Sequence, residues 1–242
     1  YFKSKKTIIL HSARKKAIEQ ANGKYIAFLD VDDWWDTKKL ESQISLFDDP
    51  EIGLACTNYW RVKGNNIDQK KLVFKQKIPT GRILNDLLKK NYIGMSTLII
   101  RRSSYDSLDY GFDDNLEVIG DYDLCLRLLV KWKLGVIQEP LSYYRWHNEN
   151  VSNKKIEVNI SELYKWHKKM KNFTPISSCK NFNCILNTAI YMETKINLLN
   201  KKSVLIFLSA LKIKDISLIL KLIIFFVTPK KIMDIYYRKN NL

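Results

Sequence analysis

Residues 21–34, which read ANGKYIAFLDVDDW, decide the fold. An unbroken apolar run over residues 25–29 ends abruptly in three aspartates, Asp30, Asp32 and Asp33. Such a run of strand-forming residues predicts a strand that is covered on both faces in a parallel α/β sheet. Ligands bind beyond the carboxyl ends of strands in open α/β sheets, so the three carboxylates indicate a binding site there.

The segments on either side of this stretch predict helices. Residues 12–21 place apolar side chains at helical spacing and end at an Asn-Gly pair, which is a usual helix stop. On the other side, Asp36 can cap a helix that runs through Phe47, with Leu40, Ile44 and Phe47 on its inward side. The strand therefore lies between two helices.

The alternation of strands and helices continues along the chain. Apolar runs predict strands at residues 53–59, 96–101 and 134–137, and helical patterns cover residues 82–90 and the segment headed by Asp121. This alternation is typical of an α/β fold.

Residues 154–242 predict a basic helical extension after a first domain at residues 1–153. Residues 204–227 are strongly apolar, but charged side chains such as Lys214 and Lys221 interrupt them, which makes a poor membrane span. Two interpretations are open. Two helices hinged near Lys214 can lie in the interface of an anionic bilayer, or a helical hairpin can pack on the first domain.

Composition narrows the class of protein. A formal net charge of +16 indicates a partner that carries negative charge, such as a nucleic acid, an anionic membrane surface or a phosphate-bearing substrate. The sequence contains no RRM aromatic motif, zinc-finger spacing or basic recognition helix, so no nucleic acid partner is expected. Four scattered cysteines and the absence of a secretory leader at the start of the sequence predict a cytoplasmic protein.

The aspartates of residues 30–33 suit a divalent metal. Three carboxylates packed at a strand end repel one another unless a cation or a basic partner lies among them. Hard oxygen ligands of this kind favour Mg²⁺ or Mn²⁺, which commonly bridges one or two carboxylates to a diphosphate. The alternative is a solvated acidic turn in which Asp33 or Asp36 caps the next helix.

Residues 21–34, followed by Lys39-Leu40-Glu41 and Gln43, resemble the pattern A-x-G-x-Y-I-x-F-L-D-x-D-D-x-W and K-L-E-x-Q of the family 2 glycosyltransferases. Upstream, Ser12-Ala13-Arg14 resembles the start of the family's A-R-N-x-G segment, with Lys15 in place of the usual asparagine. The resemblance covers roughly residues 12–152. It implies a GT-A fold with a mixed, mostly parallel sheet and flanking helices.

A second group of motifs follows downstream. Gly111-Phe112-Asp113 and residues 120–128, GDYDLCLRL, resemble G-x-F-D followed by E-D-Y-D-L-x-L-R-L. By the resemblance, Asp121 is the general base that deprotonates the acceptor hydroxyl, as an inverting transfer requires. The family commonly has glutamate where this chain has Gly120. Asp121 also suits a helix N-cap, a role compatible with catalysis.

Residues 140–147, PLSYYRWH, with Ser152 beyond them, resemble the family's closing motif P-L-x-x-Y-R-x-H-x-x-x-x-S. The motif implies roles for an arginine and a histidine, although a lone histidine in an aromatic stretch is more often a packed residue than a ligand. The implied donor and diphosphate ligands are Arg14, Asp30, Asp32, Arg145 and His147, and the implied metal ligands are Asp32, Asp33 and His147.

The resemblance implies a metal-dependent transfer of sugar from a nucleotide donor, most commonly a UDP-sugar, to a saccharide or lipid-linked acceptor. The setting is cell-surface polysaccharide synthesis, with the protein peripheral on the inner face of the membrane. Family members begin with a strand and a D-D-x-S carboxylate pair, and neither precedes Ser12, so the first nucleotide-binding unit is predicted to be absent. The alternative is an inactive remnant that at most associates with a membrane or a partner.

Overall fold

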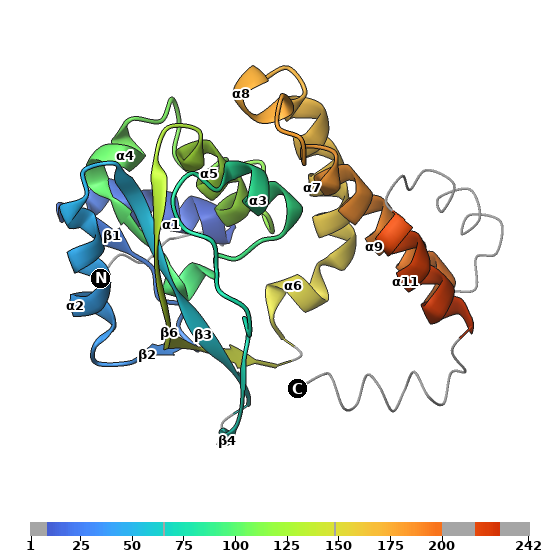
Figure 1. Cartoon of the computed structure of the whole chain (residues 1–242), viewed down its shortest axis with the longest axis horizontal. Helices are drawn as coiled ribbons and strands as arrows, with labels where there is room; N and C mark the ends of the chain where they lie inside the picture. The colour runs from blue at the N-terminus through green and yellow to red at the C-terminus, as the bar shows by residue number, and fades with distance from the viewer. Residues whose placement is uncertain (1–8, 65, 148, 200–215, 228–242) are drawn as a thin grey trace.

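The computed structural model describes residues 9–64, 66–147, 149–199 and 216–227. Within these residues, six strands form one mixed sheet in the order β1-β5-β3-β6-β2, and β4 pairs with β3 (Figure 1). The strands are β1 (Tyr25–Ala27), β2 (Trp34–Trp35), β3 (Ile52–Lys63), β4 (Asn66–Leu72), β5 (Ile99–Arg101) and β6 (Lys133–Trp146).

The long strands β3 and β6 form the parallel part of the sheet, with pairs from Ile52 and Lys133 to Lys63 and Trp146. The residues between these strands include several helices, as a parallel crossover requires. The other pairings, β1 with β5, β5 with β3, β6 with β2 and β3 with β4, are antiparallel. The predicted mixed sheet is confirmed, and its parallel character is concentrated in this long central pair.

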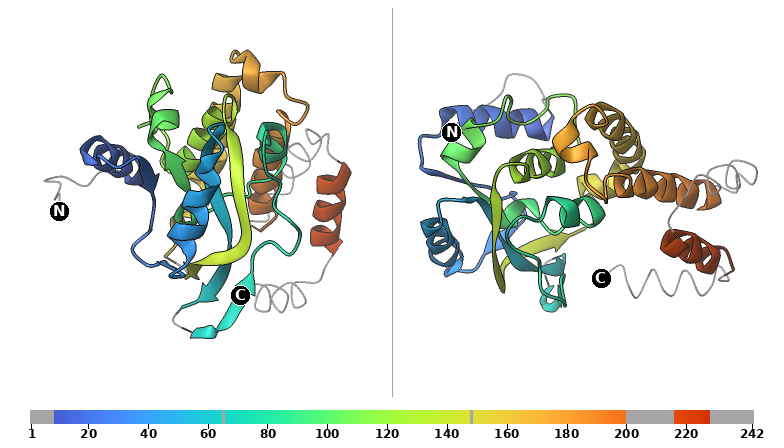
Figure 2. Two further views of the ribbon diagram at one scale, coloured as in Figure 1. Left: turned by 60° about the vertical axis from the view of Figure 1, so that its left-hand side comes forward. Right: turned by 45° about the horizontal axis from the view of Figure 1, so that its top comes forward.

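Helices cover both faces of the sheet, and the two further views in Figure 2 show the sheet between them. Alternate residues of β3 explain why both faces are covered. Leu54 and Cys56 face the larger hydrophobic cluster, whereas Ala55 faces a smaller one with Phe47. The helices are α1 (Leu10–Gln20), α2 (Lys39–Ile44), α3 (Leu84–Lys89), α4 (Arg102–Asp106), α5 (Gly120–Leu129), α6 (Val151–Lys154), α7 (Ile156–Met170), α8 (Thr174–Ser177), α9 (Cys184–Leu199) and α11 (Ile216–Val227), with 3-10 turns η1 (Ser45–Asp48) and η2 (Met95–Thr97).

Two details differ from the sequence prediction. The strand β1 ends at Ala27 and pairs antiparallel with β5, its one partner among the described residues, so it lies at a sheet edge and not within a parallel sheet. The inward side of α2 is also different. Lys39 and Gln43 are 0% exposed, whereas Leu40 is 45% exposed. The Lys39 stem packs beneath Trp35, with its Nζ 4.3 Å from the ring centroid, and this turns Leu40 outward.

The helices after residue 153 pack on the sheet domain, as Figure 1 shows for α7. Trp166 belongs to the larger hydrophobic cluster, and its Nε1 donates to Asp123 Oδ1 over 2.8 Å. The helix α11 packs against α9 through Leu222 and Ile190. The hinge predicted near Lys214 lies outside the described residues, and the domain boundary at 153/154 stays a prediction. In the described part of the chain, no helix is both long and apolar enough to cross a bilayer.

Candidate active site

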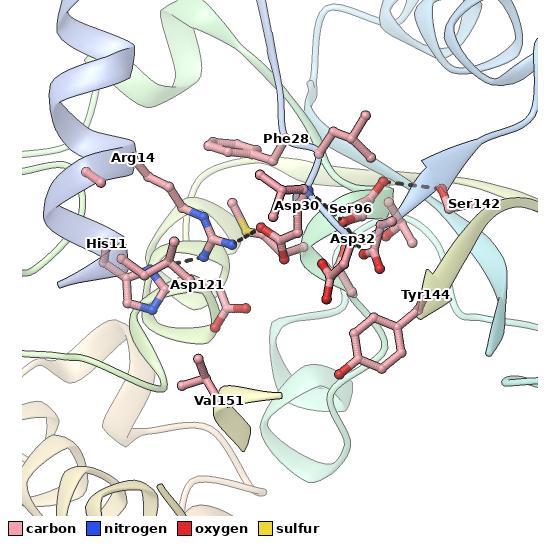
Figure 3. Close-up of a pocket in the computed structure, with 18 of the residues that line it drawn as sticks. His11, Arg14, Phe28, Asp30, Asp32, Ser96, Asp121, Ser142, Tyr144 and Val151 are labelled. Atoms are coloured by element: carbon pink, nitrogen blue, oxygen red, sulfur yellow. Dashed lines mark hydrogen bonds and ion pairs between the residues drawn. The ribbon is translucent and has the colours of Figure 1, made fainter. Parts of the chain in front are cut away.

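A cavity of about 940 Å³ opens beyond the ends of β1 and β6, between α1 and the start of α5. It gathers side chains from segments that are far apart in the sequence, and Figure 3 shows several of them pointing into it. All but one of the predicted site residues line it. The residues that line the cavity are Arg14, Asp30, Asp32, Asp33, Asp121 and His147. The exception is Arg145, which lies behind Asp32.

Asp30 is the first carboxylate of the turn that follows β1, and it has a basic partner. Its Oδ1 lies 2.5 Å from Arg14 Nη2, and the Arg14 side chain is only 11% exposed. The backbone N–H of Asp33 donates to Asp30 O over 3.1 Å and closes the turn. The ion pair therefore joins α1 to the strand end.

Asp33 is the most enclosed of the three aspartates. Its Oδ2 accepts a 2.5 Å hydrogen bond from Ser96 Oγ, and its Oδ1 accepts a 2.9 Å bond from the backbone N–H of Arg145. Burial raises the pKa of Asp33 to about 6, against the opposing effect of these two hydrogen bonds. Both carboxylate oxygens are therefore engaged by the protein.

Ser96 is a site residue that the sequence reasoning missed. Besides donating to Asp33, its Oγ accepts the backbone N–H of Asp30 over 3.2 Å. Its carbonyl accepts Trp35 Nε1 at 2.6 Å and Ser142 Oγ at 3.2 Å. A serine at the start of a predicted strand carries no signal of this kind, because its partners come from segments distant in sequence.

Asp32 faces the cavity together with His147. The Asp32 Oδ2 and His147 Nε2 atoms are 2.8 Å apart, and the two side chains are 31% and 33% exposed. Arg145 Nε donates to the Asp32 carbonyl over 2.8 Å, and its guanidinium lies 5.1 Å from the Trp34 ring centroid. Arg145 thus holds the aspartate turn through the backbone, and its predicted contact with a diphosphate stays a prediction.

Asp121 lies on the opposite side of the cavity, in the first turn of α5. The N-cap residue of this helix is Ile119, so the N-cap interpretation of Asp121 is wrong by two positions. Asp121 Oδ1 accepts its neighbour's backbone N–H, that of Tyr122, over 2.7 Å. A carboxylate in the first turn is stabilised by the helix dipole.

The loop before α5 is held by Glu162 of α7, which the sequence reasoning also missed. The buried carboxylate of Glu162 accepts the backbone N–H groups of Glu117, Val118 and Ile119 over 2.6, 2.9 and 3.1 Å. On the other side of this loop, His11 of α1 is buried against Gly120. Sequence spacing gives no sign of either contact, because three separate helices meet there.

The fit of a divalent cation can be judged from these positions. In the described ranges, no group of three or more His, Cys, Asp or Glu side chains is arranged to hold a metal ion. Asp32 and His147 lie together, but both oxygens of Asp33 are hydrogen-bonded elsewhere. The pair suits Mg²⁺ or Mn²⁺, which often takes only one or two protein ligands and completes its shell with phosphate oxygens and water.

Comparison with known proteins finds similarity to one family and to several of its members. Residues 1–108 match the family described as glycosyl transferase family 2. The chain is 33% identical over 147 residues to the Escherichia coli UDP-Glc:alpha-D-GlcNAc-diphosphoundecaprenol beta-1,3-glucosyltransferase WfgD, covering 60% of this chain and 54% of that protein. It is 28% identical over 151 residues to the amylovoran biosynthesis glycosyltransferase AmsB of Erwinia amylovora, covering 54% and 45%.

A solved structure has a similar fold. The crystal structure of S. aureus TarS superposes with a TM-score of 0.50 and 18% identity, over 75% of this chain and 30% of that one. The likeness shows a GT-A fold and nothing beyond the fold. The chain spans about half the length of the curated relatives that it matches.

Proposed function

We propose that this chain, whose residues 1–108 match glycosyl transferase family 2, carries the catalytic site of an inverting, metal-dependent sugar transfer. One observation supports this most strongly. A single cavity has the carboxylate turn of residues 30–33 with Arg14 on one side and the Asp121 carboxylate on the other. Inversion requires such an arrangement, with a base on the side of the sugar opposite to the leaving group.

On the donor side, Asp32 and His147 would hold Mg²⁺ or Mn²⁺. When bound, the ion supplies positive charge that neutralises the departing diphosphate. Arg14 lies beside Asp30 at the same wall, and a guanidinium there adds a bidentate donor for phosphate oxygens. Asp33 then acts through the turn that it anchors, since both of its oxygens are occupied by Ser96 and Arg145.

On the acceptor side, Asp121 takes the proton of the acceptor hydroxyl as its oxygen attacks the anomeric carbon. The bond between that carbon and the diphosphate oxygen breaks, and the electron pair leaves with the nucleoside diphosphate. One displacement inverts the anomeric centre and needs no covalent intermediate.

The donor is proposed to be a UDP-sugar and the acceptor a saccharide or a lipid-linked saccharide in cell-surface polysaccharide synthesis. The names of the relatives support this choice. WfgD is named for a UDP-glucose donor and a diphosphoundecaprenol-linked acceptor, and AmsB is named for amylovoran biosynthesis.

Peripheral contact with an anionic membrane is also proposed, through α11. This helix exposes four large apolar side chains, with Lys221 exposed among them. An exposed apolar face with a lysine beside it suits the interface of an anionic bilayer. The four residues are Ile216, Leu220, Ile223 and Ile224.

Binding of UDP by calorimetry, with and without Mn²⁺, tests the donor site. Metal-dependent binding is expected, and Asp32→Ala should abolish it. Asp36→Ala is the matched control, because Asp36 is close in sequence but does not line the cavity. Absence of UDP binding by the folded, unaltered chain would overturn the proposal and favour an inactive remnant.

Flotation with phosphatidylglycerol vesicles tests the membrane contact separately. The unaltered chain should float with the vesicles, and the double variant Ile223→Ser/Ile224→Ser should remain at the bottom of the gradient. Leu40→Ser is the control, since it removes an exposed leucine from α2 instead. Equal flotation of all three proteins would exclude α11 as the contact.

A further inference from the structure

Gly120, the residue before the proposed base, lies against the ring of His11. An added Cβ at Gly120 would meet His11 Cδ2 at 2.6 Å, Cγ at 2.8 Å and Nε2 at 3.1 Å. Both residues are buried, and His11 is 2% exposed. Because protein interiors are close-packed, the imidazole takes the room that any side chain at position 120 would need.

Backbone conformation does not account for this glycine. In the described part of the chain, Gly64 and Gly81 have positive φ angles, whereas Gly120 opens the α-helix α5 with helical backbone. Glycine weakens a helix relative to alanine. The contact with His11 therefore explains the absence of a side chain at position 120.

His11 is held on its other sides as well. Its ring stacks on Phe112, with centroids 5.2 Å apart and an interplanar angle of 19°. His11 Nδ1 lies 3.4 Å from Arg14 Nη1. Because a guanidinium only donates, we assign Nδ1 as the acceptor and the ring proton to Nε2. The ring is therefore a wedge between α1 and the start of α5, and Figure 3 shows His11, Arg14 and Asp121 at the same end of the cavity.

The electrostatic consequence concerns Asp121. Burial lowers the pKa of His11, and the nearby charge of Asp121 acts in the opposite direction. An acidic side chain at position 120 would place a second negative charge beside the Asp121 carboxylate, whereas Gly120 and a neutral imidazole do not.

We propose that His11 is a positioning residue for the Asp121 carboxylate, acting as a wedge between Phe112 and Gly120 that fixes the first turn of α5. This role rests on the proposed function, because it requires Asp121 to be the catalytic base. The physical contact between His11 and Gly120 does not depend on that function and can be tested alone.

A double-mutant cycle followed by thermal unfolding tests the contact. Gly120→Ala should lower the unfolding midpoint, because its Cβ collides with the ring. The same substitution in a His11→Ala background should lower the midpoint less or raise it, because the ring is gone and alanine favours the helix. Equal effects of Gly120→Ala in both backgrounds would overturn the wedge.

Nitrogen-15 NMR of the histidine rings tests the coupling to Asp121 with His11 intact. Asp121→Asn should shift the His11 ring signals. His167, which stacks on Phe182, is the matched control and should not respond. An unchanged His11 spectrum in Asp121→Asn would overturn the positioning role.

UDP binding and transfer separate this role from the donor site. His11→Ala should leave the affinity for UDP unchanged while the rate of transfer falls. A loss of UDP affinity would instead place His11 with Arg14 and overturn the assignment to Asp121. Failure of the unaltered chain to bind UDP would count against the proposed function, and it would leave the measured contact between His11 and Gly120 as it stands.

Discussion

The two sides of the cavity are built differently. On the donor side, three aspartates lie within four residues, and each has a protein partner: Arg14 for Asp30, His147 for Asp32, and Ser96 with Arg145 for Asp33. On the base side, a single carboxylate is placed by helices that are far apart in sequence. These helices are α1, which carries His11, α5, which carries Asp121, and α7, which carries Glu162.

The difference indicates how substitutions on each side of the cavity should act. A cluster of carboxylates is better tolerated without a metal when each carboxylate has a protein partner, so the donor side can exist before a ligand arrives. The base side depends on helix packing, so its geometry is tied to the stability of the fold. Substitutions on the two sides should therefore separate binding, catalysis and folding.

The largest effect is expected at the base itself. Asp121→Asn keeps the shape of the side chain and its hydrogen bond from Tyr122 N–H, but it cannot accept a proton. Transfer should fall by about 10²- to 10⁴-fold, the usual contribution of a general base. UDP affinity should not change, because the donor side is intact. Transfer at the original rate would remove Asp121 from the mechanism.

The next effect separates folding from donor binding. Glu162→Ala leaves three backbone N–H groups without their buried acceptor, and each such loss costs roughly 1 to 3 kcal/mol when water cannot replace it. With partial hydration, we expect a loss of about 3 kcal/mol in the free energy of unfolding, measured in urea. The control is Glu157→Ala, in the exposed first turn of the same helix. Equal losses of stability in Glu162→Ala and Glu157→Ala would show that Glu162 has no particular role in holding the loop before α5.

The donor side could be predicted largely from the sequence, because residues 21–34 are contiguous and each aspartate lies where a strand ends. The same holds for α1, α3 and α5, whose local patterns agree with their packing. Local patterns failed for α2, where the stem of Lys39 rather than the apolar Leu40 is buried. They also gave no sign of Ser96, His11 or Glu162.

These omissions have a common physical reason. A buried polar contact between segments 45 or 63 residues apart leaves no periodicity in either segment. The sequence did show that Gly120 departs from the family pattern, but only the fold shows that His11 fills the space above it. Resemblance to a family locates individual residues, whereas the partners that they contact on other helices are seen only in the fold.

A pH-dependent effect on the donor side comes next. The pKa of Asp33 is raised to about 6 by burial, above an unfolded value near 4. The folded chain therefore binds this proton more tightly than the unfolded chain. The stabilising contribution is fully present below about pH 4 and is lost as pH rises through 6, a change of roughly 2 to 3 kcal/mol.

Asp33→Asn tests that contribution in the metal-free chain. Asparagine can keep the bond from Arg145 N–H and donate to Ser96 Oγ, so the turn should survive. The variant should be more stable than the unaltered chain at pH 7, and the difference should shrink toward pH 4. Urea unfolding at a series of pH values measures it. Parallel curves for the two proteins would contradict the raised pKa.

The smallest effect is expected beneath the donor side, where α2 buries the positive charge of Lys39. Among the described residues, Lys39 Nζ has no hydrogen-bond partner and lies over the Trp35 ring, and burial lowers the pKa of Lys39 to about 8. Lys39→Met keeps the stem and removes the charge, so it should stabilise the fold at pH 7 by about 1 to 2 kcal/mol, allowing for the lost cation–π contact. The advantage should diminish above pH 8, where the folded chain releases the proton.

Lys38→Met on the exposed side of the same turn should change little. A loss of stability in Lys39→Met would show that the Trp35 platform, and through it Ser96, depends on the buried cation.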